Sequence, residues 1–203
     1  MKNIVGNWNI SATYTLQSPE YATVQSGVDS NLNGDSAGDR AIINPNGVAG
    51  TGSGVVPYNH AGQSVASLTA PGCAGFKVLS KCQANTVAYV AISSNAQYIV
   101  AGSGALATGG RNTLPLGRTD NIDASLQKRF RINERMAVEV GIQAFNILNH
   151  PQFTGGSLDD VVPIQTNAVS RNPLIPSSAD FNRFDLYFPS NARTAQLVAK
   201  FTF

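Results

Sequence analysis

The chain has 203 residues, of which 42% are hydrophobic and only 13% are charged, with 19 glycines and 10 prolines. This length indicates one or two domains, and the low charge with abundant Gly, Asn, Ser and Thr favours strands joined by polar loops over a helical protein. The formal charge of +2, with scattered Lys and Arg, excludes a typical nucleic-acid-binding protein, and the absence of a long apolar run excludes a transmembrane helix.

The start of the chain, residues 1–7, lacks the apolar core of a signal peptide, and the first predicted strand spans residues 4–17. Every second side chain from Trp8 to Leu16 is apolar and the intervening ones are polar, so the strand has two different faces. Tilted in a barrel wall, the eleven residues from Asn7 to Gln17 rise roughly 28 Å, enough to cross an apolar band of about 25 Å. Trp8 and Tyr14 suit its interfacial aromatic girdles, although a soluble β-sandwich strand would show the same alternation.

Residues 18–119 are predicted to form a long polar loop, with at most a local hairpin between residues 86–92 and 98–101. A loop of this length is unusual inside a compact domain, but extracellular loops between barrel strands are often long. Cys73 and Cys82 lie in this loop. In an oxidising compartment they would close a small disulfide loop, and otherwise they would be free thiols.

An Asp-rich stretch of this loop is a candidate calcium site, because its oxygen-bearing side chains recur at alternate positions around a glycine that permits a sharp turn. The candidate ligands are Asp29, Asn31, Asn33, Asp35 and Asp39. An EF-hand is excluded, since Arg40 stands where the bidentate Glu should be and no helical pattern flanks the stretch. Two hypotheses remain: a looser calcium site, and a loop stabilised by Asx turns and an Asp–Arg pair.

Two further strands are predicted at residues 120–130 and 135–147, separated by a short polar turn. The apolar face of the first carries Ile122, Ala124, Leu126 and Phe130. Lys128 interrupts this face near its end, where a long side chain can reach the membrane interface. Alternating Val and Ile favour a strand over the rival helix at residues 134–148. Residues 149–192 then form a second long loop, interrupted by prolines.

The last predicted strand spans residues 193–203. Its apolar face carries Ala195, Leu197, Ala199, Phe201 and Phe203. An apolar face on a terminal strand promotes aggregation in a soluble sandwich, whereas lipid covers it in an outer-membrane barrel. The sequence therefore predicts an all-β fold made of antiparallel strands of a partial transmembrane β-barrel. We expect about four long strands, long extracellular loops and one short periplasmic turn.

Several segments, in this order and spacing, resemble the C-terminal part of TonB-dependent outer-membrane receptors of the Oar-like group, whose members carry an N-terminal carboxypeptidase-regulatory-like domain. The segments are residues 33–40, 110–114, 121–126, 145–153 (Phe-Asn-Ile-Leu-Asn-His-Pro-Gln-Phe) and 193–203. The resemblance implies a protein of the bacterial outer membrane that takes up a bulky nutrient with energy delivered by TonB. It also implies a barrel of about 22 strands closed around an N-terminal plug.

The plug, the TonB-contacting segment and most strands are absent from residues 1–203, and four strands cannot close a barrel. We therefore expect a C-terminal fragment that contacts membrane lipid and the rest of the barrel, and reaches TonB only through the missing N-terminal part. The resemblance further implies that the barrel-insertion machinery reads the terminal strand. The residues of this insertion signal are Leu197, Ala199, Phe201 and Phe203. Packing in an aromatic girdle would account for the same aromatic side chains.

No catalytic constellation is recognisable, since the Gly-rich segments lack a following Gly-Lys-Ser/Thr and His150 is better interpreted as a loop-anchoring residue than as a base. We expect no enzyme and no cofactor other than the candidate calcium. The leading hypothesis is an outer-membrane transport protein, and the alternative is a secreted or surface β-rich binding protein with a calcium-stabilised loop. The transport hypothesis requires that Trp8, Leu126, Val140 and Phe201 do not converge in a dry protein core.

Overall fold

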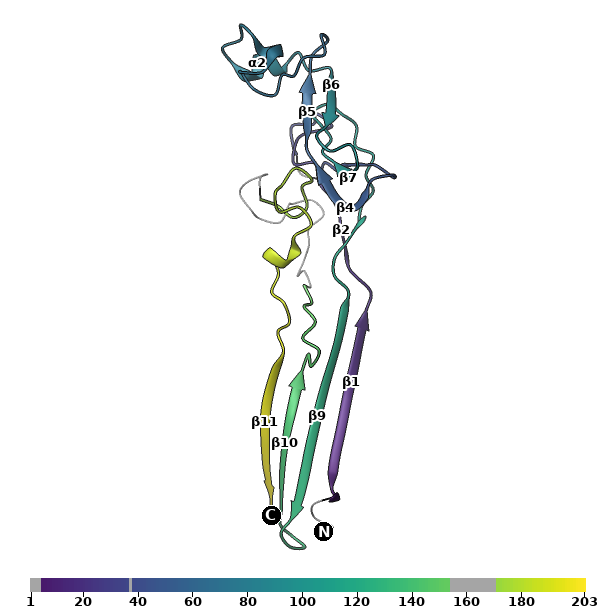
Figure 1. Ribbon diagram of the computed structural model, residues 1–203, viewed down its shortest axis with the longest axis vertical. Helices are drawn as coiled ribbons and strands as arrows, with labels where there is room; N and C mark the ends of the chain where they lie inside the picture. The colour runs from purple at the N-terminus through teal and green to yellow at the C-terminus, as the bar shows by residue number, and fades with distance from the viewer. Residues whose placement is uncertain (1–4, 37, 154–170) are drawn as a thin grey trace. The chain divides into compact units, whose positions relative to one another are not determined.

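The computed structural model describes residues 5–36, 38–153 and 171–203, which are mostly strands and loops (Figure 1). The chain divides into two compact units. We call the first the sheet unit (Met1–Glu20, Leu116–Thr154 and Phe188–Phe203) and the second the loop unit (Tyr21–Pro115 and Gly155–Tyr187). None of the helices in the described residues is both long and apolar enough to cross a membrane.

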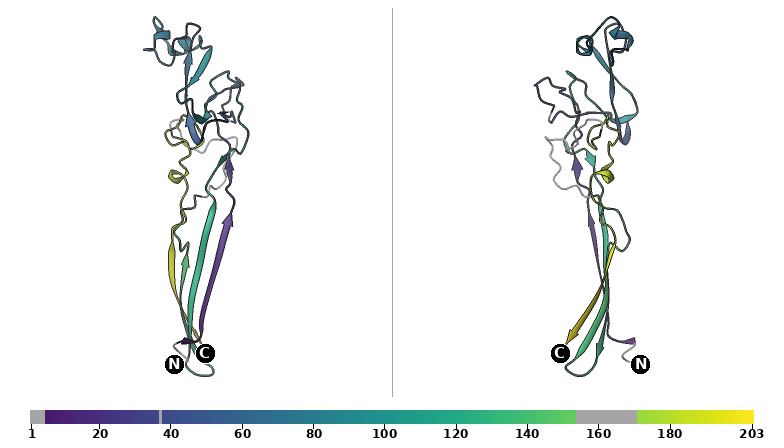
Figure 2. Two further views of the ribbon diagram at one scale, coloured as in Figure 1. Left: turned by 45° about the vertical axis from the view of Figure 1, so that its right-hand side comes forward. Right: turned by 90° about the vertical axis from the view of Figure 1, so that its left-hand side faces the viewer.

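The sheet unit is built on one antiparallel sheet of four strands in the order β1–β9–β10–β11. Its strands are β1 (Trp8–Gln17), β9 (Thr119–Arg131), β10 (Ala137–Phe145) and β11 (Thr194–Thr202). The turn between β9 and β10 lies at the same end of the sheet as the start of β1 and the end of β11 (Figures 1 and 2). The predicted all-β fold with four long antiparallel strands is confirmed, and the sheet is open.

The register of this sheet aligns apolar side chains in rows that cross all four strands. One row contains Ile10, Leu126, Ile142 and Leu197. The neighbouring row contains only alanines, at positions 12, 124, 144 and 195. Because the side-chain period of a strand is two, a slip of one residue would bring the polar residues of a strand onto this face. The alternation seen in the sequence therefore specifies the pairing.

The short turn between β9 and β10 is closed by the side chain of Asn133. Its Oδ1 accepts hydrogen bonds from the backbone N–H groups of Arg135 (2.9 Å) and Met136 (2.7 Å). The N–H of Ile132 donates to the carbonyl of Met136 at 3.0 Å, which continues the strand pairing into the turn. An Asx turn of this kind lets β10 begin at once as an antiparallel strand, so the rival helix at residues 134–148 does not form.

Short strands, rather than one continuous sheet, make up the loop unit. They are β2 (Tyr21–Ala22) paired with β8 (Leu114–Pro115), β3 (Ile42–Ile43) and β4 (Val48–Ser53) on either side of β7 (Ala96–Ile99), and β5 (Val55–Tyr58) paired with β6 (Ala88–Ala91). The predicted hairpin between residues 86–92 and 98–101 is wrong, because β6 pairs with β5 and β7 pairs with β3 and β4. Partners that lie far back in the chain leave no trace in local alternation.

Among the described residues of the loop unit there are also three short helices, η1 (Pro71–Cys73), α2 (Leu79–Gln83) and η2 (Phe184–Leu186). A disulfide joins Cys73 to Cys82 and so links η1 to α2. Both cysteines are buried with Val65, and Leu79 packs against this cluster. A helix of five residues is too short to persist alone in water, so the disulfide and the apolar cluster hold α2 in place.

Replacing both cysteines by serine should destabilise the α2 region by roughly 2 to 3 kcal/mol, because the unfolded loop regains the entropy that the cross-link removes. The measurement is the rate at which a protease cleaves residues 73–82 in the native chain. Reduction of the wild-type chain should accelerate cleavage equally, and the double variant should be insensitive to reductant. Equal cleavage rates for the oxidised wild type and the double variant would contradict this role of the disulfide.

Candidate functional site: a two-faced sheet and a polar cluster at its loop end

One face of the four-stranded sheet is apolar and open. Trp8 is 51% exposed, Leu126 37%, Val140 40% and Phe201 54%, although the register places all four on this same face. Exposed apolar side chains in continuous rows are not a protein core, and a contiguous surface of this kind marks an interaction site. The condition that the transport hypothesis placed on these four residues is met within the described chain.

The opposite face is polar, and its side chains bond to one another across the strands. The hydroxyls of Ser11 and Ser125 are 2.8 Å apart, and Asn9 Nδ2 donates to Gln127 Oε1 at 3.4 Å. Gln196 Nε2 likewise donates to Gln143 Oε1. The charged row alternates in sign, because Glu139 lies opposite Arg129 on β9 and opposite Lys200 on β11. These cross-strand pairs suit a hydrated surface, where each side chain also reaches water.

Lys128 is the cation on the apolar face, and it is almost fully covered, with 4% of its surface exposed. Its Nζ lies 4.8 Å from the centre of the Trp8 ring and 5.7 Å from that of Phe130. The same ammonium donates a hydrogen bond to the carbonyl of Gly6. Two aromatic faces and a carbonyl compensate the charge, so the apolar face tolerates it. The sequence predicted only a side chain that reaches the interface.

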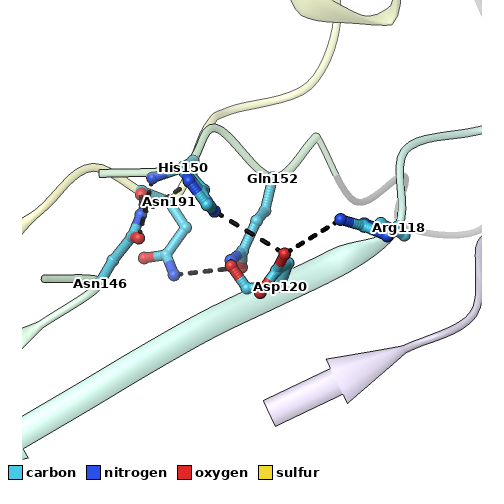
Figure 3. Close-up of polar contacts among 6 residues, drawn as sticks. All are labelled: Arg118, Asp120, Asn146, His150, Gln152 and Asn191. Carbon is cyan, nitrogen blue, oxygen red and sulfur yellow. Dashed lines mark hydrogen bonds and ion pairs between the residues drawn. The ribbon is translucent and has the colours of Figure 1, made fainter. Parts of the chain in front are cut away.

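A polar cluster lies at the end of the sheet where the long loops begin, and Figure 3 shows its side chains. We call it the loop-end cluster; it comprises Arg118, Asp120, Asn146, His150, Gln152 and Asn191. Asn146 is fully buried at its centre. Its Nδ2 donates to the carbonyls of His150 (2.9 Å) and Asn191, and its Oδ1 accepts the N–H of His150 at 3.0 Å. One side chain thus ties the segment after β10 to the segment before β11.

Asp120 organises the other half of the loop-end cluster. Its Oδ2 accepts a hydrogen bond from Arg118 Nη2 at 3.3 Å and lies 3.9 Å from His150 Nδ1. Gln152 Nε2 donates to the backbone carbonyl of Asp120 at 2.7 Å, and Asn191 Nδ2 donates to Gln152 Oε1 at 3.4 Å. These contacts join the start of β9 to both loop segments. The interpretation of His150 as a loop-anchoring residue agrees with its contacts.

The residues after β10 adopt backbone conformations that asparagine tolerates well. Asn146 and Asn149 have φ angles of 50° and 54°, in the left-handed region. The N–H of Asn146 donates to Asp123 Oδ1 at 2.9 Å, and Asn149 Oδ1 accepts the N–H of Arg193 at 3.2 Å. The segment Phe-Asn-Ile-Leu-Asn-His-Pro-Gln-Phe therefore ends strand β10. Its partner Asn191 escaped sequence reasoning, because it lies at the far end of the second long loop and no local pattern marks it.

The candidate calcium ligands make backbone contacts in the loop unit. Asp29 accepts the N–H groups of Asn33 (3.1 Å) and Gly34 (2.9 Å), and Asp39 Oδ2 accepts that of Ser30 at 2.8 Å. Asn31 and Asn33 each cap the N–H two residues further along the chain. Within residues 5–36, 38–153 and 171–203, no three His, Cys, Asp or Glu side chains gather as a metal site. These contacts favour the Asx-turn hypothesis, and calcium binding stays a prediction.

The four residues of the predicted insertion signal lie on or just beyond β11. Leu197 is 85% exposed and Phe203 91%, while Ala199 also faces outward. The rings of Phe201 and Phe203 stack with centres 6.0 Å apart. Their role in insertion stays a prediction, and the structure presents them in an accessible row.

Replacing Asn146 by glycine should destabilise the sheet unit by roughly 2 to 3 kcal/mol, because buried carbonyls and an N–H lose their partner while the left-handed backbone is preserved. Asn149→Gly is the matched control: it has the same backbone conformation but an exposed side chain, and should cost about 1 kcal/mol or less. Urea unfolding in detergent micelles measures both free energies. Equal losses would show that Asn146 is not the centre of the cluster.

The family model of the outer membrane beta barrel domain matches residues 1–181. No curated protein and no solved structure matches the sequence. The matched range contains most of the chain, and the open, two-faced antiparallel sheet agrees with it. This chain belongs to the outer membrane beta barrel domain family and is a protein of the bacterial outer membrane.

Proposed function

We propose that the chain is the C-terminal barrel segment of a TonB-dependent transporter that takes up a bulky nutrient, and that it is neither an enzyme nor a nucleic-acid-binding protein. The observation that carries the proposal is the register of β1, β9, β10 and β11, which separates an exposed apolar face from a hydrogen-bonded polar face. The resemblance of residues 145–153 and 193–203 to TonB-dependent receptors supports this particular kind of barrel.

In this proposal each face of the sheet meets a different solvent. The apolar rows contact lipid hydrocarbon, and the polar face lines the lumen through which the nutrient passes. The turn at Asn133 is periplasmic, and the loops that follow β1 and β10 are extracellular. The insertion machinery binds the terminal strand, and TonB acts through the plug-bearing part of the whole transporter.

The open edges of the sheet are consistent with a segment of a larger barrel. In the described chain, β1 pairs only with β9 and β11 only with β10, so each has one edge without a neighbouring strand. A backbone edge in hydrocarbon is costly because its N–H and C=O groups have no water to bond. We infer that other strands of the same barrel complete both edges in the membrane.

Depletion of TonB tests the transport mechanism directly. The whole gene that contains this sequence is expressed in a host in which TonB production can be switched off. Growth is measured on a bulky nutrient that the host uses only when this gene is expressed. Growth should stop without TonB, while the amount of protein in the outer membrane stays the same. Growth that continues at the same rate without TonB would contradict the proposal.

A pair of neighbouring substitutions tests the orientation of the sheet. Ile142→Arg places a charge on the apolar face and should cost about 2 to 4 kcal/mol at mid-membrane depth, so less protein should reach the outer-membrane fraction. Gln143→Arg places the same side chain on the polar face of the same strand and should be tolerated. Equal recovery of the two variants, or a larger loss for Gln143→Arg, would show that the apolar face does not meet lipid.

A further inference from the structure

The loop unit contains a cavity of about 710 Å³ that lies beside Tyr89, and we call it the Tyr89 cavity. α2 and the turn after it supply Ser80, Gln83 and Thr86, while β5 supplies Val55 and Pro57. A second cavity of about 590 Å³ adjoins it. The two share Val55, Thr86, Tyr89, Val100, Gly102 and Ser103. Ligand sites in proteins commonly have volumes of this order.

The described residues that line the Tyr89 cavity include none that is charged. Its apolar wall includes Val55, Pro57, Ile92 and Val100. The lining also includes residues with neutral hydroxyl or amide side chains, namely Ser80, Gln83, Thr86, Ser103 and Ser177. The lining therefore mixes apolar surface with neutral hydrogen-bonding groups, and this mixture limits what it can bind.

Tyr89 is held in position by contacts with two adjacent residues, Gly102 and Ser103. Its hydroxyl donates a hydrogen bond to the carbonyl of Ser103 at 3.1 Å. Gly102 lies against the ring so closely that an added Cβ would be 2.5 Å from three ring carbons, a distance at which one of the groups must move. The glycine is thus required for this ring position, and the ring remains only half-buried where it lines both cavities.

The disulfide supports the helix that supplies part of this lining. Cys82 lies on α2 between the lining residues Ser80 and Gln83, and its bond to Cys73 anchors this helix to the small apolar cluster at Val65. Thr86 Oγ1 donates to the carbonyl of Gln83 at 2.7 Å, which orders the turn after α2. The polar wall is therefore preorganised, and preorganisation reduces the entropy lost on binding.

Two classes of ligand do not suit this lining. A charged ligand would lose its hydration in a cavity whose described walls offer no counter-charge. A purely hydrocarbon ligand would cover the serine, threonine and glutamine groups and leave them without partners. A neutral ring with an apolar face and peripheral hydroxyls satisfies both walls at once. Saccharides have this chemistry.

We propose that the Tyr89 cavity binds a neutral saccharide, with the apolar face of a sugar ring against Tyr89 and its hydroxyls on the polar wall. This inference rests on the proposed function, because it names the class of nutrient that the transporter takes up. It deepens that function by placing the first recognition of the nutrient in the loop unit.

The test is binding of the whole outer-membrane protein that contains this chain, labelled with a fluorophore and held in detergent micelles, to an array of neutral and acidic oligosaccharides. Neutral glycans should bind, and their acidic counterparts should bind about tenfold more weakly or not at all. Gly102→Ala should reduce binding of the neutral glycans about tenfold, because the new Cβ displaces the Tyr89 ring. The control Gly117→Ala, whose Cβ meets no atom within 4 Å, should bind as the wild type does.

Absence of binding to every neutral glycan, equal binding of acidic glycans, or wild-type binding by Gly102→Ala would each overturn the inference. Hydrogen–deuterium exchange measured for both glycine variants shows whether the loop unit is still folded. A folded Gly102→Ala variant that does not bind the glycans supports the inference. The array contains no TonB, so its failure is distinguishable from that of the proposed function. If no glycan binds but growth depends on TonB, only the saccharide site is refuted. If neutral glycans bind but growth does not depend on TonB, only the transport mechanism is refuted.

Discussion

Cross-strand register is the constraint on which the sheet unit depends. Apolar and polar side chains alternate along each strand. The sheet therefore has one apolar and one polar face only when all four strands pair in the matching register. The pairing of Ile10 with Leu126, and of Leu126 with Ile142, achieves this alignment and leaves Ser11 beside Ser125 on the other face. Backbone hydrogen bonds hold the strands together, and the alternation of apolar and polar side chains decides whether each face suits lipid or water.

The two ends of the sheet are stabilised by different interactions. At the turn end, Asn133 closes a short connection, and Lys128 is accommodated between Trp8 and Phe130 without exposing a charge on the apolar face. At the loop end, β1 and β10 end, β9 and β11 begin, and the chain segments that leave or enter the sheet must be held together. A buried asparagine, Asn146, and the carboxylate of Asp120 link these departing segments, so the strands end at a defined level.

The loop unit has a different physical basis from the sheet unit. Its described residues form short strand pairs, Asx turns and a disulfide, and none of these described elements is long enough to be stable alone. Long-range contacts, such as β5 with β6, compensate for the weakness of each piece. This construction places the neutral groups around Tyr89 on a supported framework, as expected where loops carry recognition and strands supply the scaffold.

The sequence alone determined the positions of β1, β9, β10 and β11 and the character of their faces, because an alternation with period two is a local property of the chain. It also indicated that residues 145–153 matter, but not that Asn146 would bond to Asn191. Only the tertiary structure decided that contact, the partners of β6 and β7, and the cavity beside Tyr89. The physical reason is that these features join residues far apart in the chain, whose meeting depends on how the whole loop folds and leaves no periodic signal in either segment.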